Sequence, residues 1–290
     1  MRHVRAYGLV GLAGLALAAV AYAQSTAPTT AAKDSKPAAA ASAPTAASTG
    51  HDPNAYAELA KTHWGDAKAG AAKAGACAAC HGLDGNATAN PALYPRIAGQ
   101  SEQYVAKQLA LFKSGMRTSG NAALMIPYAD ALTPQDMRDL GAHFQAQHSG
   151  SGVADDTAIA SGPYAGKKLY QVGEKLYRQG DNSRGIVACT ACHGPDGAGN
   201  PGPAYPHIGG QQSWYAERRL SEYRAGTSPL KDDKLFALMA LETKNLSDDE
   251  IKGLATYLQG LHNRADQASA ADVAAAKQAA ASTAPTPSKN

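Results

Sequence analysis

The stretch Cys77-Ala78-Ala79-Cys80-His81 recurs later in the chain as Cys189-Thr190-Ala191-Cys192-His193. C-x-x-C-H is the attachment signature of c-type haem, in which each of the two thiols adds to one vinyl group of the porphyrin. The histidine that follows then binds the iron as its proximal ligand. Because the 290-residue chain has four cysteines and all four lie in these motifs, the sequence predicts two covalently attached haem c groups.

Other uses of paired cysteines fit the sequence less well. Two C-x-x-C knuckles that share a zinc ion are normally about 15–20 residues apart, whereas more than a hundred residues separate Cys80 from Cys189. A zinc site also does not require a histidine after each pair. A thioredoxin-like redox pair needs a βαβ pattern around one C-x-x-C, and no strand-rich segment surrounds either motif. Structural disulfides are the least favoured alternative.

The composition limits both the partners and the core. The formal net charge is +3, and no basic stretch of the kind that follows nucleic acid is present, so we expect no nucleic-acid partner. Alanine and glycine are plentiful and there are only three phenylalanines. We therefore expect the haems to supply much of the apolar filling, and the apoprotein to fold poorly.

The N-terminal residues 1–23 have the pattern of a secretory signal peptide. Arg2 and Arg5 lie in its basic region, residues 8–20 form a short apolar run, and residues 21–23 give an A-x-A cleavage site. The run is short for a membrane span, which needs about 20 residues. Cleavage is the favoured outcome, and it would lower the net charge by two, to +1; retention as a membrane anchor is the alternative.

Low-complexity sequence flanks the central part of the chain. Residues 24–51 are rich in Ala, Ser, Thr and Pro and are predicted to form a disordered linker, and residues 265–290 form an Ala-rich tail. A signal peptide agrees with haem c attachment outside the bacterial cytoplasm. We therefore expect a periplasmic protein, either soluble or tethered to the inner membrane through an uncleaved leader.

Between these ends lie two copies of one unit, predicted as two domains over residues 52–150 and 151–264. Segments of the two copies correspond at offsets of 111 to 114 residues. The matching pairs are His81-Gly82-Leu83-Asp84-Gly85 with His193-Gly194-Pro195-Asp196-Gly197, YPRIAGQ at 94–100 with YPHIGGQ at 205–211, and Leu132-Thr133 with Leu246-Ser247. The predicted linker between the copies is the Gly-, Ser- and Asp-rich segment 149–161.

Each unit is predicted to be all-α, with about three main helices around its haem, and no convincing alternating strand appears. The helices are expected over 53–74 and 164–178, from Ser101 and Ser213 to just before Gly115 and Gly226, and from the N-caps Thr133 and Ser247. Gly70 and Gly173 lie in the first helix of each unit, where a missing side chain allows the last helix to cross closely.

The second axial ligand of each iron is predicted to be methionine. Met125 and Met239 each lie seven residues before the Leu-Thr or Leu-Ser pair, at 48 residues from Cys77 and 50 from Cys189. A matched methionine in a loop at repeat-equivalent sites is better explained by ligation than by packing, and His/Met ligation is the cytochrome c pattern. Met137 is read as a packing residue and Met116 has no counterpart. The other candidate ligands, read as surface or packing residues, are His63, His143, His148, His207 and His262.

Further repeated residues are expected close to the haems. Pro95 and Pro206 are predicted to present a carbonyl to the Nδ1–H of the proximal histidine, with Pro91 and Pro203 as competitors for that role. Contacts with the haem propionates are expected from Tyr94, Tyr205, Arg96, Gln100 and Gln211. The alternative is that these residues only build the loop that follows the haem motif.

Taken together, these motifs resemble the dihaem cytochrome c4 family over about residues 54–262. The resemblance rests on two C-x-x-C-H-G motifs, on D-G-N at 84–86 and D-G-x-G-N at 196–200, on Y-P-x-I-x-G-Q, and on the methionine before L-T/S. It implies two tandem class I cytochrome c domains whose haem edges face each other across a pseudo-twofold axis. It also implies a respiratory carrier that passes electrons from a cytochrome bc complex or a dehydrogenase to a haem-copper terminal oxidase.

An electron-transfer protein rather than an enzyme is therefore expected, because a six-coordinate iron leaves no position for a substrate. One alternative is a dihaem peroxidase-like enzyme, which would need an open position on one iron and acid–base groups beside it. The other is the haem subunit of a dehydrogenase complex.

Overall fold

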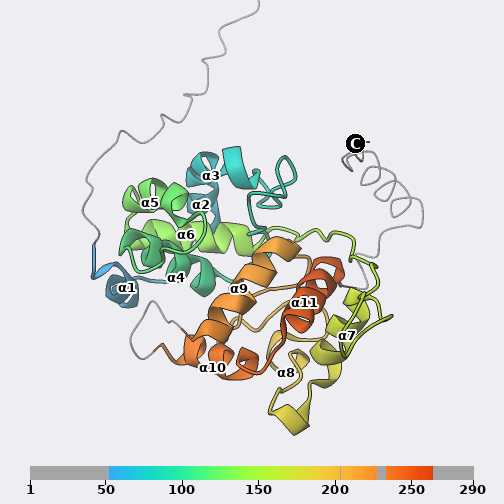
Figure 1. The fold of residues 1–290 in the computed structure, drawn as a ribbon. Coiled ribbons are helices and arrows are strands. Elements are labelled where there is room, and N and C mark those ends of the chain that lie inside the picture. The colour runs from blue at the N-terminus through green and yellow to red at the C-terminus, as the bar shows by residue number, and fades with distance from the viewer. Residues whose placement is uncertain (1–51, 203, 227–232, 264–290) are drawn as a thin grey trace, which may run out of the picture. The chain divides into compact units, whose positions relative to one another are not determined.

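The computed structural model describes residues 52–202, 204–226 and 233–263, all within one compact unit that spans residues 41–290 (Figure 1). The predicted signal peptide, the N-terminal linker and the Ala-rich tail lie outside the described residues. Over those ranges the chain is helical, and its only β pairings are isolated bridges. None of the helices in these ranges combines the length and apolar character that crossing a membrane requires.

Domain 1 contains six α-helices and one 3₁₀ turn over its described residues. They are α1 (Ala55–Glu58), η1 (Leu59–Lys61), α2 (Ala67–Lys73), α3 (Gly75–His81), α4 (Glu102–Lys113), α5 (Ala122–Asp130) and α6 (Pro134–Gln145). Domain 2 repeats much of this order. Its elements are α7 (Leu169–Gln179), η2 (Asn182–Arg184), α8 (Thr190–His193), α9 (Ser213–Ala225), α10 (Lys234–Thr243) and α11 (Asp248–Gly260).

The second and third predicted helices of each domain are confirmed, and side-chain caps explain where three of these four helices start. The Ser101 hydroxyl accepts a hydrogen bond from the Tyr104 N–H at the start of α4. Thr133 and Ser247 each form a complete capping box, which satisfies donors that a helix N-terminus otherwise leaves free. Gly226 ends α9 in the left-handed conformation that glycine adopts at low cost.

The prediction of one continuous first helix over 53–74 is wrong. The chain runs as α1 and η1, becomes extended at Thr62, and starts again as α2. Asp66 causes the restart, because its side chain accepts hydrogen bonds from the N–H groups of Lys68 and Ala69. In domain 2 the first helix begins at Leu169 rather than at Tyr164.

The two matched methionines lie in helices, not in loops as the sequence analysis expected. Met125 is in α5 and Met239 is in α10, so each domain has a further helix that was not predicted. Pro127 inside α5 disfavours a helix prediction there. The side chain of Asp233 accepts hydrogen bonds from two N–H groups at the start of α10 and so initiates that helix.

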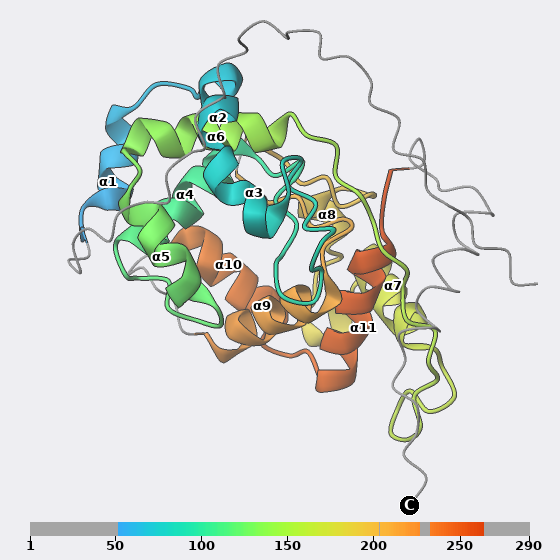
Figure 2. The same ribbon diagram turned by 90° about the horizontal axis from the view of Figure 1, so that it is seen from above.

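The first and last main helices of each domain cross at glycine. α2 packs against α6, and α7 packs against α11 (Figure 2). A Cβ atom on Gly70 would overlap the carbonyl of Asp139, and one on Gly173 would overlap the carbonyl of Gly253. The predicted close crossing is confirmed at both positions. Met137 is fully buried beside the domain 1 crossing, in the same core as Leu140 and Phe144.

Glu250 is a buried carboxylate that ties domain 2 together. Its side chain is 1% exposed and accepts hydrogen bonds from Arg184 (2.6 Å) and from the Tyr164 hydroxyl. Burial disfavours its ionisation, but these bonds and the Ser247 N–H outweigh it and hold the pKa of Glu250 below its usual value. The stabilisation from this carboxylate is therefore present above the pKa it has when unfolded, and it is lost as pH falls through the lower folded pKa.

Glu250→Gln is accordingly expected to lower the free energy of unfolding at pH 7 by about 2 kcal/mol, because it removes the buried carboxylate from Arg184 and leaves Asp181 as the counter-ion that the structure gives this guanidinium. Denaturant titration of the haem-loaded protein measures this loss. The control is Glu174→Gln, whose partner Arg178 is exposed, and it should change stability by less than about 0.5 kcal/mol. Equal losses in the two variants would contradict the role of Glu250.

Candidate functional site

Both C-x-x-C-H motifs line one continuous cavity of about 580 Å³. Every residue predicted to attach a haem or to bind its iron lines this cavity. In domain 1 these are Cys77, Cys80, His81 and Met125, and in domain 2 they are Cys189, Cys192, His193 and Met239. Two such sets at one cavity place the two candidate haem sites next to each other.

A proline carbonyl fixes each motif histidine. The Nδ1 atom of His81 is 2.9 Å from the carbonyl oxygen of Pro95, and Nδ1 of His193 is 3.0 Å from that of Pro206. Because a carbonyl can only accept a hydrogen bond, Nδ1 carries the proton and Nε2 is the ring nitrogen available to a metal. Burial lowers the pKa of both imidazoles, although the carbonyls oppose it, so both rings are neutral as metal ligation requires.

The competing prolines have other positions. The carbonyl of Pro91 accepts a hydrogen bond of 2.8 Å from the indole N–H of Trp214, in the opposite domain. Pro203 lies outside the described residues. The hydrogen bond between Trp214 and Pro91 links the loop that follows the first haem motif to domain 2, and sequence analysis did not predict this contact.

Each of the four cysteines is partly buried, and none of them forms a disulfide. Burial raises the pKa of Cys77 to about 11 and that of Cys189 to about 12. Before haem attachment both thiols would therefore be protonated at neutral pH, unlike a nucleophilic cysteine, which acts as the thiolate. Their environment is an apolar cavity wall, which suits thioether attachment to a porphyrin edge.

Two tyrosines flank the motif histidines in the same way. The ring centroid of Tyr94 is 6.1 Å from that of His81, and the ring centroid of Tyr205 is 6.3 Å from that of His193. Both tyrosines line the cavity. They therefore form part of the wall on the histidine side of each site.

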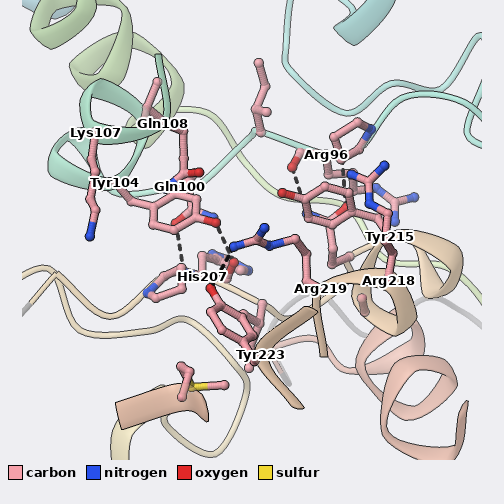
Figure 3. A pocket seen from close by; sticks show the side chains of 18 of the residues that line it. Arg96, Gln100, Tyr104, Lys107, Gln108, His207, Tyr215, Arg218, Arg219 and Tyr223 are labelled. Carbon is pink, nitrogen blue, oxygen red and sulfur yellow. Dashed lines mark hydrogen bonds between the residues drawn. The ribbon is translucent and has the colours of Figure 1, made fainter. Parts of the chain in front are cut away.

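Gln100 and Gln211 join the two domains through a reciprocal pair of contacts. The Gln100 side chain donates to the His207 carbonyl (2.9 Å) and accepts from the His207 N–H (2.8 Å). Figure 3 labels both residues. The Gln211 side chain makes the same two bonds with the Arg96 backbone, at 2.9 and 3.0 Å. Because residues 96 and 207 are repeat-equivalent, these bonds obey a pseudo-twofold axis. Sequence analysis predicted that these two amides contact the haem propionates, and it did not predict that they bind the opposite domain.

Arg96 belongs to the same interface. Its guanidinium donates to the carbonyl of Gly210 in domain 2, and the pKa of Arg96 is lowered by burial. His207 stands at the equivalent position in domain 2, where burial lowers its pKa as well. The polar side chains at this position therefore lie between the domains, and they also line the cavity.

A cluster of arginines and tyrosines also lines the cavity, and no motif predicted it. Arg117 donates to the hydroxyl of Tyr215 (2.9 Å) across the domain boundary. Arg219 donates to the hydroxyl of Tyr223 (3.1 Å), and Arg218 lies over the ring of Tyr215 (Figure 3). The repeated pair Tyr104 and Tyr215 was the available sequence signal, but the arginines that accompany it are not repeated.

These arginines provide the test of whether the cavity fits a haem. The Nε atoms of Arg117, Arg218 and Arg219 are buried and form no hydrogen bond among the described residues, although Nε of Arg218 lies 3.5 Å from the Glu222 carboxylate in an ion pair. Buried guanidinium N–H groups pair most strongly with carboxylates, which a haem carries as its two propionates. The thiols, the imidazoles, the thioethers and these cationic donors together match the functional groups of two haems.

Comparison with known proteins agrees with this chemistry. The sequence pattern of the cytochrome c family matches residues 57–146 and again 165–262. Cytochrome c4 of Pseudomonas aeruginosa is 38% identical over 198 residues, which cover 68% of this chain and 90% of that protein. The chain belongs to the cytochrome c4 family. Reduced recombinant cytochrome c4 from Pseudomonas stutzeri has a similar structure, with a TM-score of 0.58 at 36% identity, covering 68% of this chain and all of that one.

Two further similarities are to proteins whose names refer to thiosulfate dehydrogenase. A thiosulfate dehydrogenase electron acceptor from Stutzerimonas stutzeri is 35% identical over 182 residues, covering 63% of this chain and 77% of that protein. Thiosulfate dehydrogenase from Marichromatium purpuratum contains a similar fold, with a TM-score of 0.54 at 29% identity over 67% of this chain and 40% of that chain.

Membership in the cytochrome c4 family confirms the predicted fold class and cofactors. The protein is all-α over its described residues and consists of two cytochrome c domains. It carries two covalently attached haem c groups, one at Cys77 and Cys80 and one at Cys189 and Cys192. It is a dihaem c-type cytochrome that transfers electrons between redox partners.

Proposed function

We propose that this cytochrome c4 works in the periplasm as a respiratory carrier, taking electrons from a bc complex or a dehydrogenase and delivering them to a haem-copper terminal oxidase. In each domain, one histidine and one methionine would hold the haem iron. The pairs are His81 with Met125 and His193 with Met239. The haem iron supplies one-electron redox chemistry when bound, and a thioether ligand favours its ferrous state.

The observation that carries this proposal is the position of the two methionines. Met125 and Met239 are repeat-equivalent, and each is half-buried and lines the same cavity as the motif histidine of its own domain. If a histidine and a methionine both hold each iron, the protein would leave no position there for a substrate. This symmetry favours a carrier over a peroxidase-like enzyme, which needs one iron with an open position.

The surrounding residues support electron transfer without bond chemistry. The carbonyls of Pro95 and Pro206 keep each imidazole in one tautomer and one orientation, so the ligand set does not rearrange between oxidation states. Buried arginines next to the cavity compensate the negative charge of propionates. The reciprocal glutamine contacts hold the two sites at a fixed separation, as relay between two haems requires.

A thiosulfate-oxidising dehydrogenase is a specific candidate for the electron donor, because relatives of this chain are named as acceptors for such an enzyme. The experiment mixes the reduced protein rapidly with purified haem-copper oxidase under oxygen, and separately the oxidised protein with thiosulfate dehydrogenase and thiosulfate. We expect both haems to be oxidised in the first mixture and reduced in the second. Turnover of hydrogen peroxide, with no oxidation by the oxidase, would contradict the proposal.

A further inference from the structure

The helix that carries Met239 is fastened at its start by a residue of the other domain. Lys107 of α4 donates from Nζ to both carboxylate oxygens of Asp233, at 3.0 and 2.9 Å. Asp233 is the N-cap of α10, and its Oδ1 also accepts from the N–H groups of Leu235 and Phe236. One carboxylate therefore links the start of α10 to domain 1.

This ion pair is well shielded from water. The side chain of Lys107 is 14% exposed and that of Asp233 is 8% exposed. Loss of either partner leaves a mostly buried charge without its counter-ion, which costs much more than the loss of a surface pair. Met239 lies in the middle of α10, so a shift at the N-cap moves its thioether relative to His193 across the cavity.

A related contact runs in the opposite direction. Arg218 of α9 is the repeat equivalent of Lys107, and its guanidinium lies against Gly120, where a Cβ would overlap Nη1. Gly120 directly precedes Asn121, the N-cap of α5, and α5 carries Met125. The start of each methionine helix is thus contacted by the long helix of the opposite domain.

The far end of each methionine helix is held within its own domain. Lys113 of α4 donates to the carbonyl of Asp130 (3.0 Å), the last residue of α5, and to that of Leu132 (2.6 Å), which follows the helix. Arg224 of α9 donates to the carbonyl of Leu246 (2.9 Å), which follows α10. Lys107 and Lys113 therefore lie on one helix and support the methionine helices of different domains.

We propose that Lys107 is a positioning residue for Met239, so that domain 1 sets the strength of the bond between Met239 and the iron of domain 2. The inference rests on the proposed methionine ligation. Lys107 acts through Asp233 and α10, not through a contact with Met239 itself. The affinity of the domain 2 iron for an electron then depends on how the two domains are docked.

Two substitutions with opposite charge changes separate this role from a direct electrostatic effect. Lys107→Met removes a positive charge near the cavity, and Asp233→Asn removes a negative one. A direct field effect would lower the reduction potential of the domain 2 haem in the first variant and raise it in the second. Weaker methionine ligation lowers that potential in both variants, because methionine favours the ferrous state.

The experiment uses the haem-loaded full-length protein and measures both the reduction potentials and the binding of imidazole to the oxidised form. Imidazole displaces a weakly held methionine from the iron. In the reduced protein, the NMR resonance of each methionine's methyl group shows separately for each haem whether its methionine is bound. In Lys107→Met and Asp233→Asn we expect imidazole to bind the domain 2 haem about tenfold more tightly, equivalent to about 1.4 kcal/mol. The domain 1 haem should stay unchanged, and Lys107→Arg, which can still pair with Asp233, should behave as the wild type.

The matched control is Lys113→Met, which removes the same charge from the same helix. It is expected to loosen methionine ligation in domain 1 and not in domain 2. A raised domain 2 potential in Asp233→Asn, or equal responses of both haems in Lys107→Met, would overturn the positioning role. Absence of methionine methyl resonances in the wild type would instead overturn the axial ligation on which the proposed function rests.

Discussion

Gly173→Val is expected to lower the free energy of unfolding of domain 2 by about 3–5 kcal/mol, enough to unfold it in a protein of ordinary stability. At the crossing of α7 and α11, a Cβ on Gly173 would overlap the carbonyl of Gly253. The atoms that this Cβ would meet all belong to the backbone, so no rotamer change can move them away. The helices must separate, which opens the core formed by Val172, Leu176 and Leu254. Denaturant titration, followed by far-UV circular dichroism and by the haem absorption bands, measures the loss.

The control for this variant is Gly75→Ala. Gly75 is also a helical glycine, but a Cβ there would meet nothing within 4 Å. Alanine favours a helix over glycine by up to about 1 kcal/mol, so this variant should be as stable as the wild type or slightly more stable. Wild-type stability of Gly173→Val would show that the crossing tolerates a side chain, and would contradict the packing described for both domains.

Met239→Ala is expected to convert the domain 2 haem into a five-coordinate centre that binds carbon monoxide when reduced. About half of the haem absorption should then respond to carbon monoxide, because Met125 still holds the other iron. The reduction potential of the altered haem should also fall, since the thioether that favours the ferrous state is gone. Absorption spectroscopy with and without carbon monoxide, combined with a redox titration, measures both effects.

Met137→Leu controls for a general loosening of the protein. Met137 is fully buried in the domain 1 core and is not placed at an iron, so this nearly volume-conserving change should cost less than about 1.5 kcal/mol and create no carbon monoxide response. If carbon monoxide leaves the spectrum of the Met239→Ala protein unchanged, a residue other than Met239 is the second ligand of the domain 2 iron.

Local signals in the sequence predicted the parts of the fold that depend on near neighbours. Thr133 and Ser247 identify helix starts because a capping box involves residues only three positions apart. Gly70 and Gly173 identify the crossings because a helix interior otherwise disfavours glycine. The C-x-x-C-H motifs fix the haem sites for the same reason, as the attachment chemistry needs residues adjacent in the chain.

Contacts between distant residues were not predictable from the same signals. Gln100 and Gln211 were read as haem contacts, but a repeated residue can equally face its counterpart across a pseudo-twofold axis, which is where their side chains bond. Lys107 and Arg218 occupy equivalent positions but are different residue types. Comparing the repeats therefore did not reveal their contacts with the opposite domain. The break before Asp66 arises from a side-chain cap that competes with a helical pattern.

The proposed axial ligands are tested by the absorption spectrum of the purified, reduced protein with and without carbon monoxide. With a histidine and a methionine at both irons, we expect a spectrum that carbon monoxide leaves unchanged. A shift in half or all of the haem absorption would show an open or labile iron position. That result would contradict ligation by Met125 or Met239, and with it the assignment of the protein as a carrier with two closed haems.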